Sequence, residues 1–447
     1  MESSLKATAS WLALSLVAVS LPCAVSQRAP AARTPNPAQL LVREQPQQLT
    51  VAEYSLPSDK LAKAEALYKT RTVLYLFGMV FGIVVLWVLL KLRVTPVLRD
   101  LAEHAGKNSF VQTLVFVSLL LLLIAIIALP LEIYGHHISL DYGLSVQGWP
   151  SWAEDWAKGQ GISLVISTLA VLTLFWIIRK SPQRWWFYFW LLTLPFAVLL
   201  IFVAPVLLDP MFNTFVPLEK TQPLLVSEIE RVTQRGGLSI PRDRMFEMEA
   251  SAKVTTYNAY VTGIGTTKRV VVWDNTARDL TVPETLFVFG HEMGHYVLNH
   301  IYKGLAFYAV TSLLGFWLGR RMVLAMLSRW GDSWHIRSLN DLAALPVLML
   351  ALSLLTFVGE PVGNTFSRHI EHQADIYGLE VTHGLFPNNA QVAASSFQKL
   401  GEKSYDYPNP NSLLVFWSYS HPSIAERVRF CLRYDPWNTP AGSRYVK

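Results

Sequence analysis

Six long apolar runs constrain the fold of this chain more than any other feature of its sequence. They cover about residues 73–91, 112–131, 162–178, 186–208, 304–319 and 342–358. A helix needs about 17–25 predominantly apolar residues to cross a bilayer, and most of these runs are long enough. Only 16% of the residues are charged, whereas a soluble domain carries about a quarter. The sequence therefore predicts a polytopic membrane protein.

The last two runs, 304–319 and 342–358, are the shortest, and buried core helices are the competing interpretation. Arg320 and Arg321 follow the first of these runs directly, and the loop after them is basic. Basic residues beside an apolar run are typical of a membrane boundary. We therefore expect both runs to span the membrane.

Residues 1–26 have the layout of a secretory signal, with a basic residue, an apolar stretch and small residues at a candidate cleavage site. An uncleaved first transmembrane segment is the alternative interpretation. Residues 27–72 are expected to form a linker rich in Pro and Gln, followed by an amphipathic segment.

Residues 209–303 are more polar, and residues 291–295 read His-Glu-Met-Gly-His. Apolar residues at helical spacing predict a helix over 224–235, and the β-branched run 269–273 predicts a strand. Thr281 and Glu284 fit a capping box that opens the helix carrying the motif.

His291 and His295 stand four residues apart, so on a helix both imidazoles project from one face and could bind one metal ion. Glu292 would then lie beside water held by that ion. A helix with two ordinary histidines is the competing interpretation. The two cysteines of the chain lack the spacing of a thiolate site, so any metal must be held by His, Asp or Glu.

A catalytic zinc ion usually has three protein ligands and one open position. On a helix, Asn364, Arg368, Glu371 and Asp375 lie within about 60° of one another and share one face. Glu371 would complete a two-histidine, one-glutamate site, and Asp375 could accept the free N–H of a ligand histidine. A solvated polar face is the alternative. Two spans separate His295 from Glu371, so the chain crosses the membrane and returns, which places both on the same side.

These residues resemble the type I CAAX prenyl proteases, a family of gluzincin membrane metallopeptidases. The likeness covers most of the chain from about Tyr54 and rests on six motifs in order. They are residues 211–218 (MFNTFVPL), 258–263 (NAYVTG), 268–274 (KRVVVWD), 291–295 (HEMGH), 364–375 (NTFSRHIEHQAD) and 420–423 (SHPS) with Arg427.

The resemblance implies one zinc ion per chain, bound by His291, His295 and Glu371, and it implies that Glu292 is the general base. Zinc lowers the pKa of its water to about 7, and a base such as Glu292 takes the proton and delivers it to the leaving amine. Asn364, Arg368 and Asp375 are then expected around the ligands.

The resemblance also implies that Asn258, Ala259 and Tyr260 offer backbone groups to an extended substrate. His421 and Arg427 would stabilise the developing oxyanion or the substrate. A structural turn histidine is the competing interpretation of His421. Thr256 and Tyr257 stand where the family often has His-Ser, so a contact near the cleft is expected to differ.

The fold expected from both arguments is mainly helical. It joins a polytopic transmembrane bundle to a small α+β zinc-metalloprotease part, whose short sheet lies beside the motif helix. A four-helix membrane region would occupy 73–208, and the metallopeptidase part 209–447 would be interrupted by the two membrane helices at 304–319 and 342–358. Six spans plus the N-terminal segment would match the seven usual in the family.

Peptide or protein substrates, either unmodified or lipid-modified, and the bilayer are the expected partners. Nucleic acid is not expected, because the net charge of +6 is small and is explained by basic residues flanking spans. Two alternatives stay open. One is a membrane-protein quality-control protease without prenylated substrates, and the other is a non-catalytic transporter or receptor with a His/Glu metal site.

The charges of the loops and the family resemblance predict opposite orientations of the chain in the membrane. The loops 92–111, 179–184 and 320–340 are basic, and the positive-inside rule places them in the cytoplasm and the metal motif outside. The resemblance implies a site that opens toward the cytosol. The signal-like N-terminus and the Pro-rich linker suggest a bacterial chain, so we expect a multi-pass protein of the bacterial inner membrane, with the side of the catalytic part open.

Overall fold

The computed structural model describes residues 49–263, 268–440 and 442–446. Among these residues, six helices are long and apolar enough to cross a membrane, and each contains one of the six apolar runs. They are α2 (Ser58–Lys91), α4 (Ser109–Asp141), α5 (Trp149–Lys180), α6 (Trp185–Val203) with the helical turns that continue it to Phe212, α12 (His300–Trp330), and α13 (Leu345–Thr382) with the short helix Leu342–Ala344 before it. The predicted polytopic architecture is confirmed. The interpretation of residues 1–26 lies outside the described residues, as does most of the expected linker.

All six candidate spans extend beyond the apolar runs that predicted them. A helix satisfies every backbone hydrogen bond within its own segment, which is what a chain in hydrocarbon requires. The first span starts at Ser58, so the amphipathic segment expected before it continues into it as one helix. The last span continues through Pro361 to Thr382 without interruption, so residues 364–375 are part of the same helix as run 342–358.

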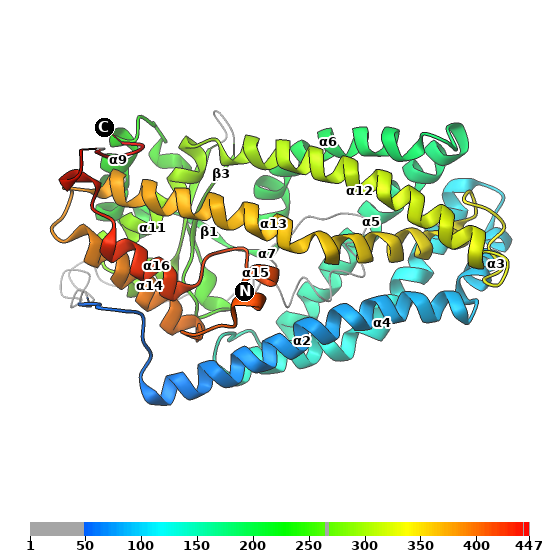
Figure 1. Cartoon of the computed structure of the whole chain (residues 1–447), viewed down its shortest axis with the longest axis horizontal. Coiled ribbons are helices and arrows are strands. Elements are labelled where there is room, and N and C mark those ends of the chain that lie inside the picture. Colours follow the sequence, from blue (N-terminus) through cyan, green and yellow to red (C-terminus); the bar gives the residue numbers. More distant parts are fainter. Residues whose placement is uncertain (1–48, 264–267, 441, 447) are drawn as a thin grey trace.

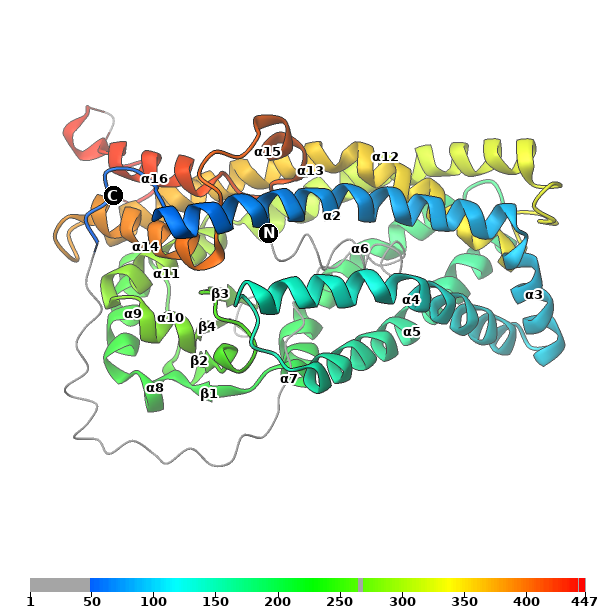
Figure 2. The same ribbon diagram turned by 90° about the horizontal axis from the view of Figure 1, so that it is seen from below.

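The long helices lie along the longest axis of the molecule, with α3 (Val94–Ala105) at one end (Figure 1). Near that end α2, α4, α5 and the start of α13 pack around the buried side chains of Leu86, Phe116, Phe175 and Val347. Seen from below, α2 and α13 run side by side toward the opposite end (Figure 2). The two membrane helices therefore lead into the part of the chain that holds the sheet.

Short strands and helices form that second part. They are α7 (Asp209–Phe212), β1 (Phe215–Pro217), α8 (Leu218–Thr221), α9 (Pro223–Arg235), β2 (Met245–Met248), β3 (Ala259–Thr262), β4 (Arg269–Trp273), α10 (Asp274–Asp279), α11 (Val282–Val297), α14 (Asn389–Ser404), α15 (Ser412–Ser418) and α16 (Ile424–Arg433). The helix predicted over 224–235 and the strand predicted over 269–273 are confirmed. Thr281 and Glu284 form the predicted capping box at the start of α11.

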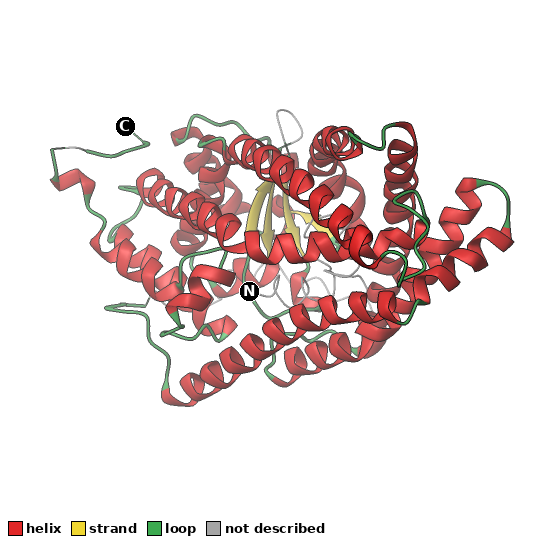
Figure 3. Ribbon diagram, turned by 45° about the vertical axis from the view of Figure 1, so that its right-hand side comes forward, coloured by secondary structure: helices red, strands yellow, loops and turns green. Residues whose placement is uncertain are grey.

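The strands of the described chain form one small sheet in the order β1-β2-β4-β3. β2 and β4 are parallel, and the two outer pairs are antiparallel, with Ala259 opposite Val272 and Tyr260 opposite Val271 in the pair of β3 and β4. Figure 3 shows this sheet among the helices. β3 is an edge strand that packs beside α11, so the motif helix lies next to one edge of the sheet.

Three glycines bring α11 close to α13. A Cβ added at Gly290 would lie 2.9 Å from Val381 Cγ1, and one at Gly294 would lie 3.0 Å from Tyr377 Cβ. On the other helix, a Cβ at Gly378 would lie 3.0 Å from the backbone nitrogen of His291. Contacts this short leave no room for a larger residue, because protein interiors are close-packed. The glycines thus set the separation of the two helices that carry the candidate metal ligands.

Candidate metal centre

Three donor side chains from α11 and α13 converge on one point. The Nε2 atoms of His291 and His295 are 3.2 Å apart. Glu371 places Oε2 3.2 Å from His291 Nε2 and Oε1 3.5 Å from His295 Nε2. The three ligand atoms lie within 4.8 Å of one another, and no other group of this kind is found among the described residues.

The chemistry of this group fits a shared cation. Glu371 Oε2 is buried and has no hydrogen-bond partner within the described part of the chain. A buried carboxylate oxygen without such a partner is costly. The two imidazole nitrogens face each other and also face this carboxylate. One positive ion can bind all three groups at once, because each can offer a lone pair.

His291 is oriented from its other ring nitrogen. Its Nδ1 lies 2.8 Å from Asp375 Oδ1, and Asp375 is 1% exposed. Arg427 donates to both oxygens of Asp375, at 2.9 Å and 2.5 Å, and its guanidinium lies 4.0 Å from the centre of the Phe397 ring. Asp375 therefore stands where the helix spacing predicted, and Arg427 holds it there.

His295 has a partner that the motif spacing does not indicate. Its Nδ1 lies 3.1 Å from Nδ1 of His300, the first residue of α12, and His300 Nε2 lies 3.0 Å from Gln373 Oε1 on α13. The available signal was a third histidine five positions after His295 and a glutamine two positions after Glu371. The same contact brings the start of α12 next to the second half of α13, as expected of a chain that crosses the membrane and returns between the two motifs.

Glu292 directly follows His291 in α11, and its side chain lies beside the three donor side chains. Its Oε1 is 3.9 Å from His291 Nε2, and the side chain is partly buried. Burial raises the pKa of Glu292 to about 7, and the nearby carboxylate of Glu371 acts in the same direction. A carboxyl group with this pKa can take up and release a proton near neutral pH.

His421 lies on the exposed side of the ligand group. Its Nε2 is 3.3 Å from Glu371 Oε2, and its Nδ1 is 2.8 Å from Ser420 Oγ. More than half of its side chain is exposed, at 53%. His421 is therefore close enough to contact a group bound beside the three donors and is open to solvent on its other side.

Asn364 and Arg368 act on the chain before His421. Asn364 donates to the carbonyl oxygen of Trp417, and Arg368 donates to those of Val415 and Tyr419. These carbonyls belong to α15 and the turn after it. The shared helix face predicted for 364–375 is thus divided, with its second half at the metal ligands and its first half supporting the segment that carries His421.

A small cavity of about 130 Å³ opens beside the motif helix. It is lined by Tyr257, Asn258, Thr276, Leu280, Phe287, Val288, His291, Glu292, Phe397, Leu400, His421 and Arg427. Apart from the site residues His291, Glu292, His421 and Arg427, most of the lining side chains are apolar. The cavity is therefore suited to an apolar group placed next to the candidate catalytic residues. Tyr257, at the position where this chain departs from the family pattern, is part of the wall.

The three residues expected along an extended substrate lie in different surroundings. Asn258 lines the small cavity, and its backbone N–H and carbonyl both bond to the Thr276 hydroxyl. Ala259 is 1% exposed. The Tyr260 hydroxyl lies 3.5 Å from Asp209 Oδ2, away from the three donors. Asn258 precedes β3 (Ala259–Thr262), and its side-chain oxygen accepts from the backbone N–H of Ala259. The backbone groups of Asn258 are therefore already bonded within the chain, and the edge of β3 begins at Ala259.

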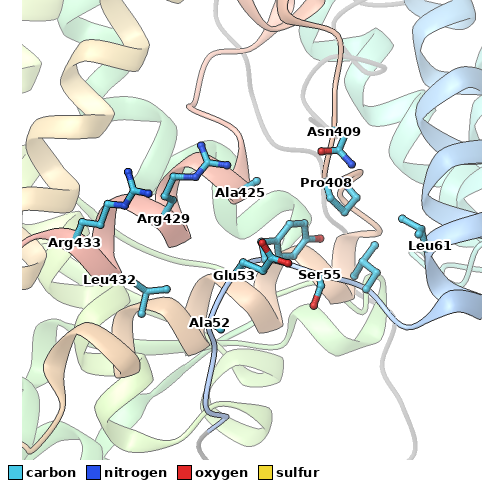
Figure 4. A pocket seen from close by; sticks show the side chains of 12 residues that line it. Ala52, Glu53, Ser55, Leu61, Pro408, Asn409, Ala425, Arg429, Leu432 and Arg433 are labelled. Carbon is cyan, nitrogen blue, oxygen red and sulfur yellow. The ribbon is translucent and has the colours of Figure 1, made fainter.

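A larger cavity of about 420 Å³ lies at the beginning of the described chain and along α16. Figure 4 shows Arg429 and Arg433 extending from α16 above Glu53 and Ser55. None of its lining residues is a candidate ligand or catalytic residue. Of the two cavities, the smaller one is therefore adjacent to the candidate ligands and catalytic residues.

The chain matches two known protein families in consecutive segments. Residues 39–214 match the family model described as the CAAX prenyl protease N-terminal region with five membrane helices. Residues 219–434 match the model of peptidase family M48.

Curated relatives agree with these matches. An uncharacterized metalloprotease of Bacillus subtilis, YhfN, is 39% identical over 378 residues, which cover 85% of this chain and 86% of the relative. CAAX prenyl protease 1 of Saccharomyces cerevisiae is 27% identical over 336 residues, which cover 72% of each protein. The crystal structure of S. mikatae Ste24p superposes with a TM-score of 0.72 at 23% identity, covering 84% of this chain and 89% of that one. This last likeness shows a shared fold.

Proposed function

This chain belongs to peptidase family M48, and from that premise we propose that it is a zinc endopeptidase using Glu292 as general base. That it is a multi-pass membrane metalloendopeptidase acting on peptides or proteins follows from the family itself. The ion, the catalytic residues and the kind of substrate are proposed here. The observation that carries the proposal is the convergence of His291, His295 and Glu371 on one point.

Zinc is proposed because of the spacing of the donors. Ligands about 2.0–2.1 Å from a tetrahedral zinc ion are about 3.3–3.4 Å apart. The two imidazole Nε2 atoms are 3.2 Å apart, and Glu371 places a different oxygen near each of them, at 3.2 Å from His291 and 3.5 Å from His295. Calcium favours 6–8 oxygen ligands at longer distances, and two imidazoles are poor ligands for it. A site with two histidines and one glutamate also leaves a fourth position open for catalysis.

Glu292, His421 and Arg427 each have a separate role in the proposed reaction. When bound, zinc lowers the pKa of water and polarises the scissile carbonyl group. Glu292 takes the proton of the attacking water on its carboxylate and delivers it to the leaving amine. His421 donates a hydrogen bond toward the carbonyl oxygen as negative charge develops there. Arg427 keeps Asp375 in place behind His291; direct contact of Arg427 with substrate stays a prediction.

The substrate is proposed to bind as an extended strand along β3. An edge strand offers backbone groups to a peptide without regard to its sequence. Ala259 and Tyr260 begin that strand, directly after Asn258. The cavity beside Glu292 would then take an apolar side chain of the peptide.

The position of Glu371 along α13 indicates where cleavage would occur. The helical rise from Leu345 to Glu371 is about 39 Å, whereas the hydrocarbon core of a bilayer is about 30 Å thick. A helix that crosses without strong tilt would therefore hold Glu371 at the membrane surface. We propose that the enzyme cuts peptides close to a hydrophobic segment or a lipid-modified end, as the name of the yeast relative suggests.

A matched set of peptides tests this function. The purified protein in liposomes would be given one peptide sequence in three forms, with a prenylated cysteine, with a hydrophobic segment and with neither. Zinc-dependent cleavage of the first two, absent in Glu292→Gln, is the expected result. Cleavage only of the segment-bearing peptide would favour a quality-control protease without prenylated substrates, and equal activity of wild type and variant would remove the proposed role of Glu292.

A further inference from the structure

We propose that His300 and Gln373 form a hydrogen-bond relay that fixes the tautomer of His295 and so prepares its Nε2 to bind the metal ion. His300 is 5% exposed, and it stands between His295 and Gln373 at 3.1 Å and 3.0 Å. This inference rests on the proposed function, because it assumes that His295 is a metal ligand.

Gln373 determines which groups in the relay donate hydrogen bonds and which accept them. Lys303 Nζ lies 3.4 Å from the Gln373 side-chain atom that also faces His300. A lysine ammonium group can only donate, so that atom is the amide oxygen. The amide nitrogen of Gln373 then lies 3.0 Å from His369 Nε2, to which it donates.

The acceptor role of the Gln373 oxygen determines the tautomers of His300 and His295. Because the Gln373 oxygen accepts, His300 Nε2 must carry a hydrogen and donate to it. A neutral imidazole carries one N–H, so His300 Nδ1 is left as an acceptor. His295 Nδ1 must therefore donate to His300, and the lone pair of His295 is on Nε2, the atom that faces His291 and Glu371. The tautomer required by a metal ion is reached without assuming where the ion sits.

The local fold places His300 for this role. Asn299 adopts a left-handed conformation with φ of 59° between the end of α11 and the start of α12. Asn tolerates this conformation better than most residues. The resulting sharp turn brings His300 back beside His295, and Gln373 arrives from α13 two residues after the proposed ligand Glu371.

The two proposed histidine ligands thus differ in what lies behind them. His291 donates to the carboxylate of Asp375, which Arg427 also holds, whereas His295 donates to a neutral imidazole. Hydrogen-bond partners behind metal ligands orient the ring and raise its affinity for the ion. His300 is therefore a positioning residue that acts through His295.

Zinc affinity of the full-length protein in detergent tests this relay. Zinc would be titrated against a competing chelator for wild type, His300→Ala, His300→Asn and Gln373→Leu. We expect His300→Ala to bind zinc about 10–100-fold more weakly, and His300→Asn, whose amide oxygen can accept from His295, to recover most of that loss. Gln373→Leu should weaken binding in the same direction. His104→Ala, on the exposed end of α3, is the matched control and should bind as wild type.

A second readout separates positioning from packing. The visible absorption of the Co²⁺-substituted protein should change in His300→Ala and return toward wild type in His300→Asn, with unchanged circular dichroism. Unchanged zinc affinity in folded His300→Ala would overturn the relay, as would equal losses in the Ala and Asn variants. If His300→Ala does not fold, Gln373→Leu with wild-type affinity would overturn it. Failure of the wild type itself to bind zinc would instead remove the proposed function, and this inference with it.

Discussion

Asp375 accepts a hydrogen bond from His291 and lies one helical turn beyond Glu371 on α13, so one helix supplies both a proposed ligand and the residue that orients another. Arg427 of α16 donates to both carboxylate oxygens of Asp375. The three buried groups connect α11, α13 and α16 at the metal centre. A change in any one of them should therefore affect both stability and metal binding.

Removing Arg427 should leave a buried, uncompensated carboxylate. We expect Arg427→Met to destabilise the protein by about 3–5 kcal/mol, the range for breaking a buried ion pair. Arg429→Met, on the exposed side of the same helix, is the matched control. Thermal unfolding in detergent measures both. A shift in Arg427→Met no larger than in the control would show that Asp375 does not depend on this guanidinium.

The Glu292→Gln variant should separate metal binding from catalysis. Gln keeps the size of the side chain but cannot act as a base, so zinc content should be unchanged while kcat/KM falls by about 10²–10⁴-fold. Zinc analysis and peptide cleavage on the same preparation provide the two readings. Loss of zinc in this variant would contradict the account, because it would make Glu292 part of the ligand set.

The acid side of the pH profile should report on Glu292. Burial raises the pKa of its carboxyl to about 7 in the metal-free site, and a bound cation would lower that pKa by favouring the charged form. The base works only when deprotonated, so kcat/KM should fall as the pH drops and should level off by about pH 7. Residual activity of Glu292→Gln should lack this acid limb. A wild-type rate that increases as the pH falls through the acid range is the opposite of this expectation.

The close approach of α11 and α13 should not tolerate a side chain at Gly378. An added methyl group would lie 3.0 Å from the His291 backbone nitrogen, so Gly378→Ala should cost about 1–3 kcal/mol through overpacking and weaken zinc binding. Gly315→Ala, in α12 where no atom lies within 4 Å of the added Cβ, should be neutral or stabilising, because Ala is the better helix former. Unfolding temperature and zinc affinity of the pair test the claim. Equal behaviour of the two variants would mean that the glycine contact does not set the ligand geometry.

Hydropathy and local signals predicted much of the fold. The six spans, the capping box at Thr281 and the strand over 269–273 depend on residues adjacent in the chain, so their patterns were sufficient. The sequence did not predict that the last span and residues 364–375 form one helix. The apolar run and residues 364–375 were considered separately, whereas the structure joins them in one helix that continues through Pro361.

The candidate site was predictable where helix geometry decides it. A four-residue spacing brings His291 and His295 together, and the crossing and return of the chain brings Glu371 to them. His300 was missed because its contact with His295 depends on a left-handed turn at Asn299, which spacing alone does not reveal. The contacts of Asn364 and Arg368 with the segment before His421 likewise depend on tertiary packing, and no single-chain pattern indicates them.

Zinc content and X-ray absorption at the zinc edge, measured on the wild type and on Glu371→Ala, test the central claim most directly. We expect about one zinc ion per wild-type chain, with two imidazole nitrogens and carboxylate oxygen at about 2.0–2.2 Å, and little zinc in Glu371→Ala. Full zinc occupancy in Glu371→Ala, or an ion without imidazole ligands in the wild type, would contradict it.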